Sequence, residues 1–346
     1  MQKHLSYYVT GHTADGFVNY VTTNVENLNV IQLNHPSYSV TTKVLEQLIS
    51  HYEADYDIEI ICSDMSEMYI DGIIIRDLSF AVITQSIIMD ALEVTANIHL
   101  EDIVGKAIDF SNQHEKIDQQ FKYAYDYFAK GLKIHDDLEK IYINEMDFSQ
   151  ADDLAEKFID QLLHDIEQKN HQPHIYRRLF GTNTIEGSVN NVPHLIQTVN
   201  KRYYVKGRAG TGKSVFMNKV ADACLEKGFD IELYHCSFDP SSIDMVLVRQ
   251  LDFCIFDSTD PHEFSPESDH DEVIDLYEET VTPGTDEKFA KDIKRVSQSY
   301  KSYMKKGVSK IKEAGRIVKD IERKYLASIA EQDIKKVVKH ILNKTA

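Results

Sequence analysis

The sequence predicts an α/β protein built from two tandem copies of one module, and three observations lead to this prediction. The chain matches itself when it is shifted by 173 residues. Within each copy, short apolar runs alternate with helical patterns, and each copy ends in a long helical pattern. Strands that alternate with helices are typical of a parallel sheet flanked by helices. We therefore expect two parallel-sheet domains, each with a helical extension.

Identical residues carry the repeat, and they occur in the same order in both copies. Residues 30–84 align with residues 203–257 without a gap. The pairs include Asp57/Asp230, Glu59/Glu232, Asp71/Asp244, Arg76/Arg249 and Phe80/Phe253. The match predicts domains at 1–172 and 173–346, with the polar stretch 167–173 as the linker between them.

Each element of the second copy follows from its local pattern. Arg202–Lys206 is a short apolar run and is expected to be a strand. Lys213–Lys227 has helical spacing, and Gly228 follows as a C-terminal cap. Phe229–Cys236 and Asp252–Phe256 have the patterns of two further strands.

Long helices are expected after the sheet residues of both copies. In the second copy, apolar residues recur every three or four positions from Tyr300 to Tyr325, which is close to a heptad pattern. A similar pattern covers Phe121–Tyr142 in the first copy. Tyr127, Lys130 and Gly131 there match Tyr303, Lys306 and Gly307.

Composition and charge restrict the class of partner. The 346 residues include 38 Lys+Arg and 56 Asp+Glu, a net charge of −18. This balance disfavours nucleic-acid binding except at the C-terminal helices, where residues 284–346 hold 17 Lys+Arg and 8 Asp+Glu. Four cysteines without CxxC spacing, and no apolar run of about 20 residues, favour a cytoplasmic protein with no membrane partner.

One motif carries the chemistry. The stretch 207–214 fits the phosphate-binding pattern G-x-x-x-x-G-K-[ST], between a predicted strand and a predicted helix. Its glycines permit a tight loop whose backbone N–H groups point inward, and the following helix directs its positive end at the same place. The residues expected to bind nucleotide are Gly207, Arg208, Ala209, Gly210, Thr211, Gly212, Lys213, Ser214 and Val215.

A second element of such a site is an apolar strand that ends in Asp, and residues 253–257 supply it with Asp257. In this interpretation Lys213 neutralises the β- and γ-phosphates, and Ser214 and Asp257 position Mg²⁺. The nucleotide is expected to be ATP or GTP.

The first copy has lost both elements. Residues 34–41, Asn-His-Pro-Ser-Tyr-Ser-Val-Thr, replace the loop, so Val40 stands in place of the lysine. Thr84 stands in place of Asp257. We therefore expect the first domain to be a non-binding copy, and one nucleotide to bind per chain. The shared residues Asp71/Asp244 and Arg76/Arg249 are expected to be structural, as an ion pair or a cap.

The residues around the loop also carry a family resemblance. The segment from Arg202 to Ser214, followed by residues 235–240 and 257–262, resembles a bacterial family of tandem P-loop ATP-binding proteins. That family is described only as ATPase or nucleotide-kinase-like, and both of its copies usually have phosphate loops. The resemblance covers nearly the whole chain and implies nucleotide binding at Gly207–Ser214.

Further candidates are weaker. Asp239 follows a predicted strand and could orient the attacking water or bind a second substrate. His262 could sense the γ-phosphate, and Asp260 and Glu263 are other carboxylates that could orient water. Arg177-Arg178 could reach the phosphate as an arginine finger, although a salt bridge is the more ordinary role.

The expected catalytic residues are thus Lys213, Asp257, Asp239 and His262. The expected function is Mg²⁺-dependent ATP hydrolysis coupled to a rearrangement of the two halves. Two alternatives stay open: a kinase for a small molecule or nucleotide, and a module that senses nucleotide without turnover. The expected partners are a nucleotide and either a protein or a small-molecule acceptor.

Overall fold

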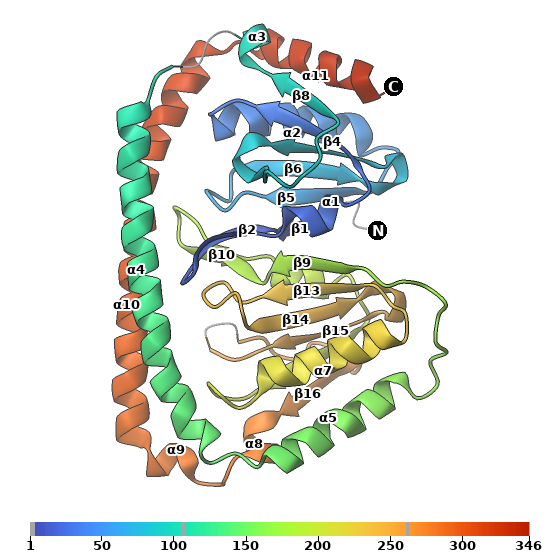
Figure 1. Ribbon diagram of the computed structural model, residues 1–346, viewed down its shortest axis with the longest axis vertical. Helices are drawn as coiled ribbons and strands as arrows, with labels where there is room; N and C mark the ends of the chain where they lie inside the picture. The colour runs from blue at the N-terminus through green and yellow to red at the C-terminus, as the bar shows by residue number, and fades with distance from the viewer. Residues whose placement is uncertain (1–3, 105–107, 261–262, 346) are drawn as a thin grey trace.

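The centre of the molecule is one continuous twelve-stranded sheet (Figure 1). The computed structural model describes residues 4–104, 108–260 and 263–345. The strands run in the order β16-β12-β15-β14-β13-β9-β1-β5-β6-β7-β4-β8. Counted outward from the centre, the two halves therefore repeat one order, which agrees with the repeat in the sequence.

The first half forms these elements: β1 (His4–Tyr8), β2 (Thr10–Thr13), β3 (Gly16–Asn19), α1 (Val21–Val25), β4 (Asn29–Asn34), α2 (Tyr38–Tyr52), β5 (Ile58–Cys62), β6 (Ile70–Ile75), β7 (Phe80–Thr84), β8 (Ala96–His99), α3 (Glu101–Val104), α4 (Ser111–Ile143) and α5 (Phe148–Leu163). Two short 3₁₀ turns, Arg76–Leu78 and Gln85–Ile87, flank β7.

The second half repeats the plan with β9 (Ile175–Leu179), β10 (Gly181–Asn183), β11 (Ser188–Asn190), α6 (Val192–Ile196), β12 (Lys201–Lys206), α7 (Lys213–Glu226), β13 (Ile231–His235), β14 (Ile243–Val248), β15 (Phe253–Asp257), β16 (Asp271–Asp275), α8 (Leu276–Thr280), α9 (Thr285–Lys288), α10 (Ala290–Ser328) and α11 (Glu331–Thr345). A 3₁₀ turn, Arg249–Leu251, precedes β15.

The α/β class is confirmed, but the expectation of a purely parallel sheet is wrong. In each half one strand, β6 or β14, runs antiparallel to both of its neighbours. The loops before these strands, residues 63–69 and 236–242, contain no helix. A parallel neighbour needs a crossover connection of a dozen or more residues, usually helical, whereas an antiparallel one needs only a short turn.

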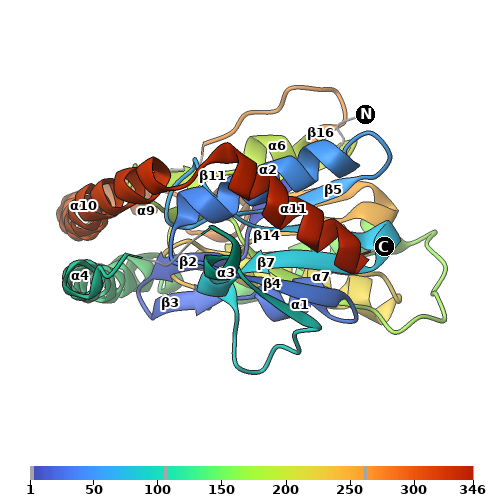
Figure 2. The ribbon, with the colours of Figure 1, turned by 90° about the horizontal axis from the view of Figure 1, so that it is seen from above.

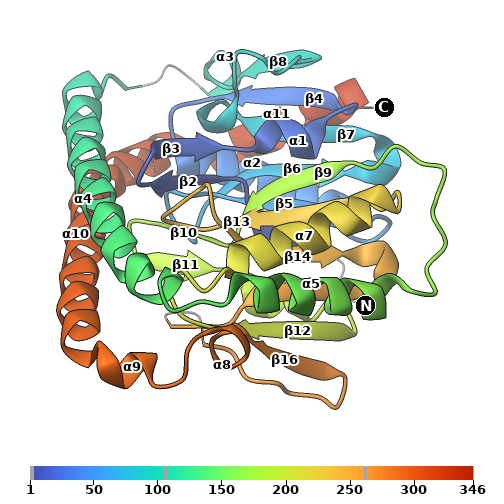
Figure 3. The same ribbon diagram turned by 60° about the horizontal axis from the view of Figure 1, so that its bottom comes forward.

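The predicted helical stripes form two long helices that lie side by side and run across the strand ends on one side of the sheet (Figures 1 and 3). The apolar positions of the α10 stripe, from Met304 to Tyr325, are buried as predicted. The two helices pack closely where each has a glycine. A Cβ at Gly307 would overlap the Phe128 ring, and one at Gly131 would overlap the Met304 side chain.

Each helical extension packs on the opposite half of the sheet. From the first half, α5 packs against α7, and Ala155 and Phe158 join the apolar core of the second half. From the second half, α11 packs against α2, which Figure 2 shows from above. Ile334 and Val337 of α11 join the apolar core of the first half. The two halves are therefore tied together by exchanged helices.

Arg178 is buried at the junction of the halves, with 2% of its surface exposed. Its guanidinium donates to Glu232 at 2.6 Å and to Glu59 at 3.3 Å and lies 3.5 Å over the Tyr7 ring. Burial of a charge is tolerated when it is paired in this way. The arginine-finger interpretation of Arg178 is therefore wrong.

The shared arginines and aspartates do not pair with one another. Arg76 pairs with Glu59, and Arg249 pairs with Glu232. The role expected for these arginines, a structural ion pair, is therefore confirmed with a different partner. Among the described helices, none is long and apolar enough to cross a membrane.

The helix crossing supplies the first test. Gly307→Leu should lower the free energy of unfolding by about 1–3 kcal/mol, because the added side chain has to displace the Phe128 ring. Lys306→Leu places the same side chain at the preceding position of α10, which is exposed, and serves as the control. Thermal and denaturant unfolding of both variants measure the difference. Equal stability of the two variants would contradict close packing at this crossing.

Candidate functional site

The loop 207–212 lies at the edge of the sheet between β12 and α7, which is the predicted strand–loop–helix context. Strand β12 runs parallel to β15, and their register pairs Val205 with Asp257. The carboxyl ends of parallel strands meet at the same edge of a sheet. This pairing brings Asp257 next to the loop, as the sequence predicts.

The glycines of the loop are required by its conformation. Gly210 and Gly212 have φ values of +73° and +77°, which side chains disfavour. A Cβ at Gly207 would lie 2.5 Å from Thr211 Oγ1. Thr211 Oγ1 accepts from the N–H of Arg208 and donates to its carbonyl oxygen, so this residue closes the turn from inside.

Lys213 is the first residue of α7 and folds back over the loop. Its ammonium group donates to the carbonyl oxygen of Arg208 at 2.8 Å and lies 3.6 Å from Asp257 Oδ2. Helix α7 begins at Gly212 without a hydrogen bond from a capping side chain. The first N–H groups of a helix have no partner inside the helix, so this end offers donors and partial positive charge.

Ser214 and Asp257 meet the requirements for holding a hard cation such as Mg²⁺. Both supply oxygen atoms, which Mg²⁺ prefers. Ser214 Oγ accepts from the Ile243 N–H at 2.9 Å, and Asp257 Oδ1 accepts from Thr259. Asp257 Oδ2 faces the Lys213 ammonium. Over the described residues, no group of three or more His, Cys, Asp or Glu side chains could hold a metal alone. A cation here would therefore also need oxygens from phosphate or water.

A cavity of about 2030 Å³ opens beside the loop. Its walls come from the loop and α7, from the ends of β13, β14 and β15, and from the facing sides of α4 and α10. Val215 and Phe148 are two large apolar residues on its wall, with exposed fractions of 60% and 58%. These two side chains give the wall exposed apolar surface.

The first-half helix α4 reaches this loop. A Cβ at Gly210 would lie 2.7 Å from the Glu139 carbonyl oxygen, and one at Gly212 would lie 3.5 Å from the Met146 methyl. Arg208 extends the contact: it pairs with Asp286 at 2.9 Å, and Asp286 also accepts from the Tyr142 hydroxyl. Arg208 therefore links the loop to the end of α4 and to the segment that leads into α10.

Asp239 lies on the cavity wall, where it caps its own turn. One carboxylate oxygen accepts from the Ser241 N–H and hydroxyl, and the other accepts from the Ser242 hydroxyl at 2.6 Å. The structure therefore brings the predicted residue to the cavity, with its carboxylate engaged in the turn.

Asp244 is a site residue that sequence reasoning placed in a structural role. It lies on the cavity wall, and burial together with the nearby charge of Asp257 raises its pKa to about 7. The thiol of Cys236 and the charge of Lys213 act in the opposite direction. Because Asp71 occupies the matching position in the first half, the repeat gave no signal that Asp244 faces the site.

The weaker candidates have mixed outcomes. Asp260 and Glu263 lie on the cavity wall, and Asp260 forms an ion pair with Lys301 of α10 at 2.5 Å. His262 lies outside the described residues. Arg177 donates to His235 Nε2 at 3.1 Å, and His235 Nδ1 donates to the Pro240 carbonyl oxygen at 2.7 Å, so neither Arg177 nor His235 serves the loop.

The first-half counterpart of the loop is filled by a carboxylate of the protein itself. Glu322 of α10 is 4% exposed and lies at the start of α2. It accepts from the N–H groups of Tyr38 at 3.2 Å and Ser39 at 2.8 Å, and from the Ser37 hydroxyl at 2.6 Å. Under the 173-residue shift, these N–H groups match those of Thr211 and Gly212. The anion-binding end of this helix is thus already occupied.

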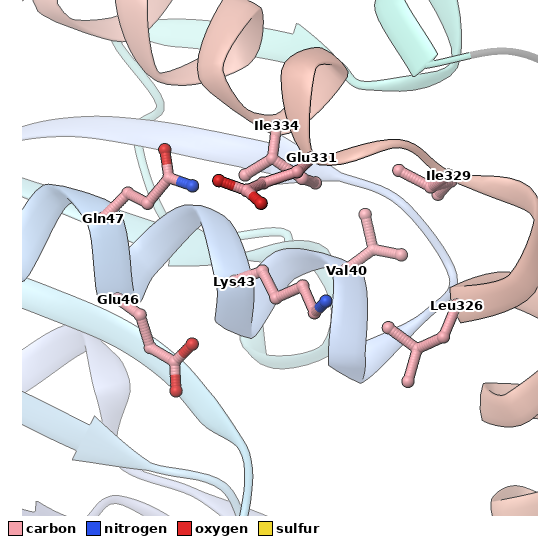
Figure 4. A pocket seen from close by; sticks show the side chains of 8 residues that line it. All are labelled: Val40, Lys43, Glu46, Gln47, Leu326, Ile329, Glu331 and Ile334. Atoms are coloured by element: carbon pink, nitrogen blue, oxygen red, sulfur yellow. The ribbon is translucent and has the colours of Figure 1, made fainter.

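Val40, in the position of the lysine, is 1% exposed. It faces Leu326 and Ile329 in a pocket of about 230 Å³ between α2 and the end of α10 (Figure 4). A lysine here would have to bury its charged side chain at a position that is 1% exposed, which is costly. Together with Glu322, this environment explains why the first copy no longer has the features of a phosphate site.

Removal of the Glu322 carboxylate tests its role. Glu322→Ala should lower the free energy of unfolding by about 1–3 kcal/mol, because buried N–H groups lose their acceptor. Glu322→Gln keeps an acceptor oxygen and should cost less. Glu313→Ala, on the same helix and paired only with Lys310, is the control. Denaturant unfolding measures all three, and a Glu322→Ala variant as stable as the control would contradict the role.

Comparison of the chain with protein-family models, with curated proteins and with solved structures found no match. The resemblance noted from the loop residues therefore stays a prediction, and the site has to be interpreted from its own geometry.

Proposed function

We propose that the chain binds ATP with Mg²⁺ at Gly207–Ser214 and hydrolyses its β–γ phosphoanhydride bond. One observation carries the proposal: the uncapped start of α7 lies beside a large cavity, with Lys213 and Asp257 next to it. The matching helix of the other half has the same place filled by Glu322. The contrast favours a ligand with negative charge at the second loop.

Different groups of the chain would bind different parts of such a ligand. Backbone N–H groups of the loop and the start of α7 would donate to phosphate oxygens. Lys213 would exchange its present acceptor, the Arg208 carbonyl, for the β- and γ-phosphates. Val215 and Phe148 offer apolar surface to the base.

Ser214 and Asp257 would hold Mg²⁺ together with phosphate oxygens. When bound, the ion would neutralise charge that develops on the phosphates. The Asp257 carboxylate already faces the Lys213 ammonium group at 3.6 Å.

Asp244, on the cavity wall, is the group proposed to take a proton from an attacking water. A general base works best when its pKa is near the working pH, and the pKa of Asp244 is raised to about 7. Asp239, beside it on the cavity wall, is held by its turn and would orient the water rather than accept its proton.

Arg208 offers a path from the nucleotide to the two long helices. It is a loop residue, and it pairs with Asp286, to which the α4 residue Tyr142 also donates. A change in the loop on ATP binding or phosphate release would alter the ion pair between Arg208 and Asp286. We therefore propose that the nucleotide cycle changes the packing of α4 and α10, and so of the two halves.

A second candidate function is phosphoryl transfer to a small molecule. The observation that favours it is the size of the cavity, about 2030 Å³, against roughly 300–1,000 Å³ for ordinary ligand pockets. Water needs no such space, whereas an acceptor does.

The test is the variant Lys213→Ala. It should weaken ATP binding by about tenfold or more, equal to about 1.4 kcal/mol, and abolish release of labelled phosphate from γ-labelled ATP. Lys227→Ala, at the far end of the same helix, is the control and should behave as wild type. Calorimetry and a phosphate-release assay give the two readouts. Wild-type ATP affinity in Lys213→Ala would refute the site, and label transferred to an added acceptor would favour the kinase.

A further inference from the structure

We propose that the cavity holds a second binding site, for a small molecule that carries a phosphate group, and that Lys305 and Lys312 of α10 bind this group. The inference rests on the proposed function, because it takes the loop 207–212 beside the cavity as the nucleotide site. The argument has four parts, which concern space, geometry, charge and the comparison of the two halves.

The cavity has room for two ligands. Its volume of about 2030 Å³ is about twice the upper end of the range for pockets that bury one drug-sized ligand, roughly 1,000 Å³. The phosphate loop and α7 form one wall, and the α10 residues from Ala290 to Lys312 form another. The loop and the α10 wall thus belong to different elements that face the same cavity.

Three polar residues of that wall lie on one face of the helix. Lys305, Ser309 and Lys312 are spaced by four and three residues, so they project from the same side on successive turns. With a rise of about 1.5 Å per residue, the two lysines are separated by roughly 10 Å along the helix axis. Their long side chains can therefore converge on one anion, with the Ser309 hydroxyl between them.

The charges of these two lysines are not balanced by the protein. Within the described part of the chain, neither Lys305 nor Lys312 lies within 4.0 Å of a carboxylate. Some other α10 lysines do form such pairs, namely Lys301 with Asp260, Lys310 with Glu313 and Lys319 with Glu186. Among the described residues, Lys294 on the same wall has no carboxylate within 4.0 Å either. In a chain of net charge −18, these unpaired cations on a cavity wall point to an anionic ligand.

The first half lacks this feature. When the two helices are aligned at Gly131 and Gly307, Ala129 corresponds to Lys305 and Asp136 corresponds to Lys312. The helix that belongs to the copy with the intact loop therefore has both cations, and its counterpart has neither. The two lysines and the intact loop therefore occur in the same copy, as expected if both serve one site.

A phosphate group fits this pair better than a carboxylate does. A phosphate monoester carries close to two negative charges near neutral pH and accepts hydrogen bonds from several directions. Lysine ammonium groups bind phosphate as point charges, without the planar geometry that favours arginine with carboxylates. Two ammonium groups and a hydroxyl would match the charge and the acceptors of one phosphate.

The test uses the full chain with Mg²⁺ and the imido analogue of ATP, so that the loop is occupied. The probe is ³²P-labelled inorganic pyrophosphate, measured by equilibrium dialysis. Wild type should bind about one additional equivalent in a saturable manner. The double variant Lys305→Glu/Lys312→Glu should weaken this binding at least tenfold, which corresponds to about 1.4 kcal/mol. Affinity for the analogue should not change.

The matched control is Lys291→Glu/Lys306→Glu, which makes the same change in charge at exposed positions of α10 away from the cavity. It should bind pyrophosphate as wild type does. Absence of saturable binding to wild type, or an equal loss in both double variants, would overturn the proposal. Displacement by equimolar succinate would overturn the choice of phosphate. If the analogue itself fails to bind, the nucleotide site fails, while a selective loss of pyrophosphate binding would still support the lysine site.

Discussion

The contact between Glu322 and the start of α2 is the interaction on which the organisation of the molecule depends. Helix N-termini at this edge of the sheet carry unpaired N–H donors, and a buried donor without an acceptor is costly. The first half meets this need with its own carboxylate, which α10 supplies from the other half. At α7 no side chain caps the helix, and the cavity lies there instead. The start of one of the two matching helices is thus closed by the protein, and the start of the other faces the cavity.

The exchanged helices connect the closed loop of the first half with the open loop of the second. Helix α10 runs from the open loop, near Asp286, to the closed loop, at Glu322. Helix α4 lies beside it and runs in the opposite direction, from the first half to the second (Figure 1). The Gly131 and Gly307 crossing holds the pair together, and the Arg178 network joins the halves at the centre of the sheet. Helix α10 therefore links the surroundings of the two loops.

Local patterns predicted much of this structure, and long-range contacts set the remainder. The repeat predicted that both halves share one plan, local spacing predicted α7 and α10, and the loop motif predicted the position of Asp257 beside the loop. The antiparallel strands β6 and β14 escaped prediction because an apolar run has no direction. The Glu322 contact joins residues 285 apart, and no periodicity reports such a pairing. Asp244 was assigned a structural role because Asp71 shares its position, although only one of the two faces the large cavity.

The stoichiometry of nucleotide binding tests the central claim most directly. Isothermal calorimetry of the full chain with Mg²⁺ and a non-hydrolysable ATP analogue should give one site per chain, because Glu322 and Val40 close the first loop. Two equivalent sites would contradict the claim, since the first loop would then accept phosphate in spite of its carboxylate. Absence of binding would contradict it as well, because the uncapped start of α7 would then have no ligand.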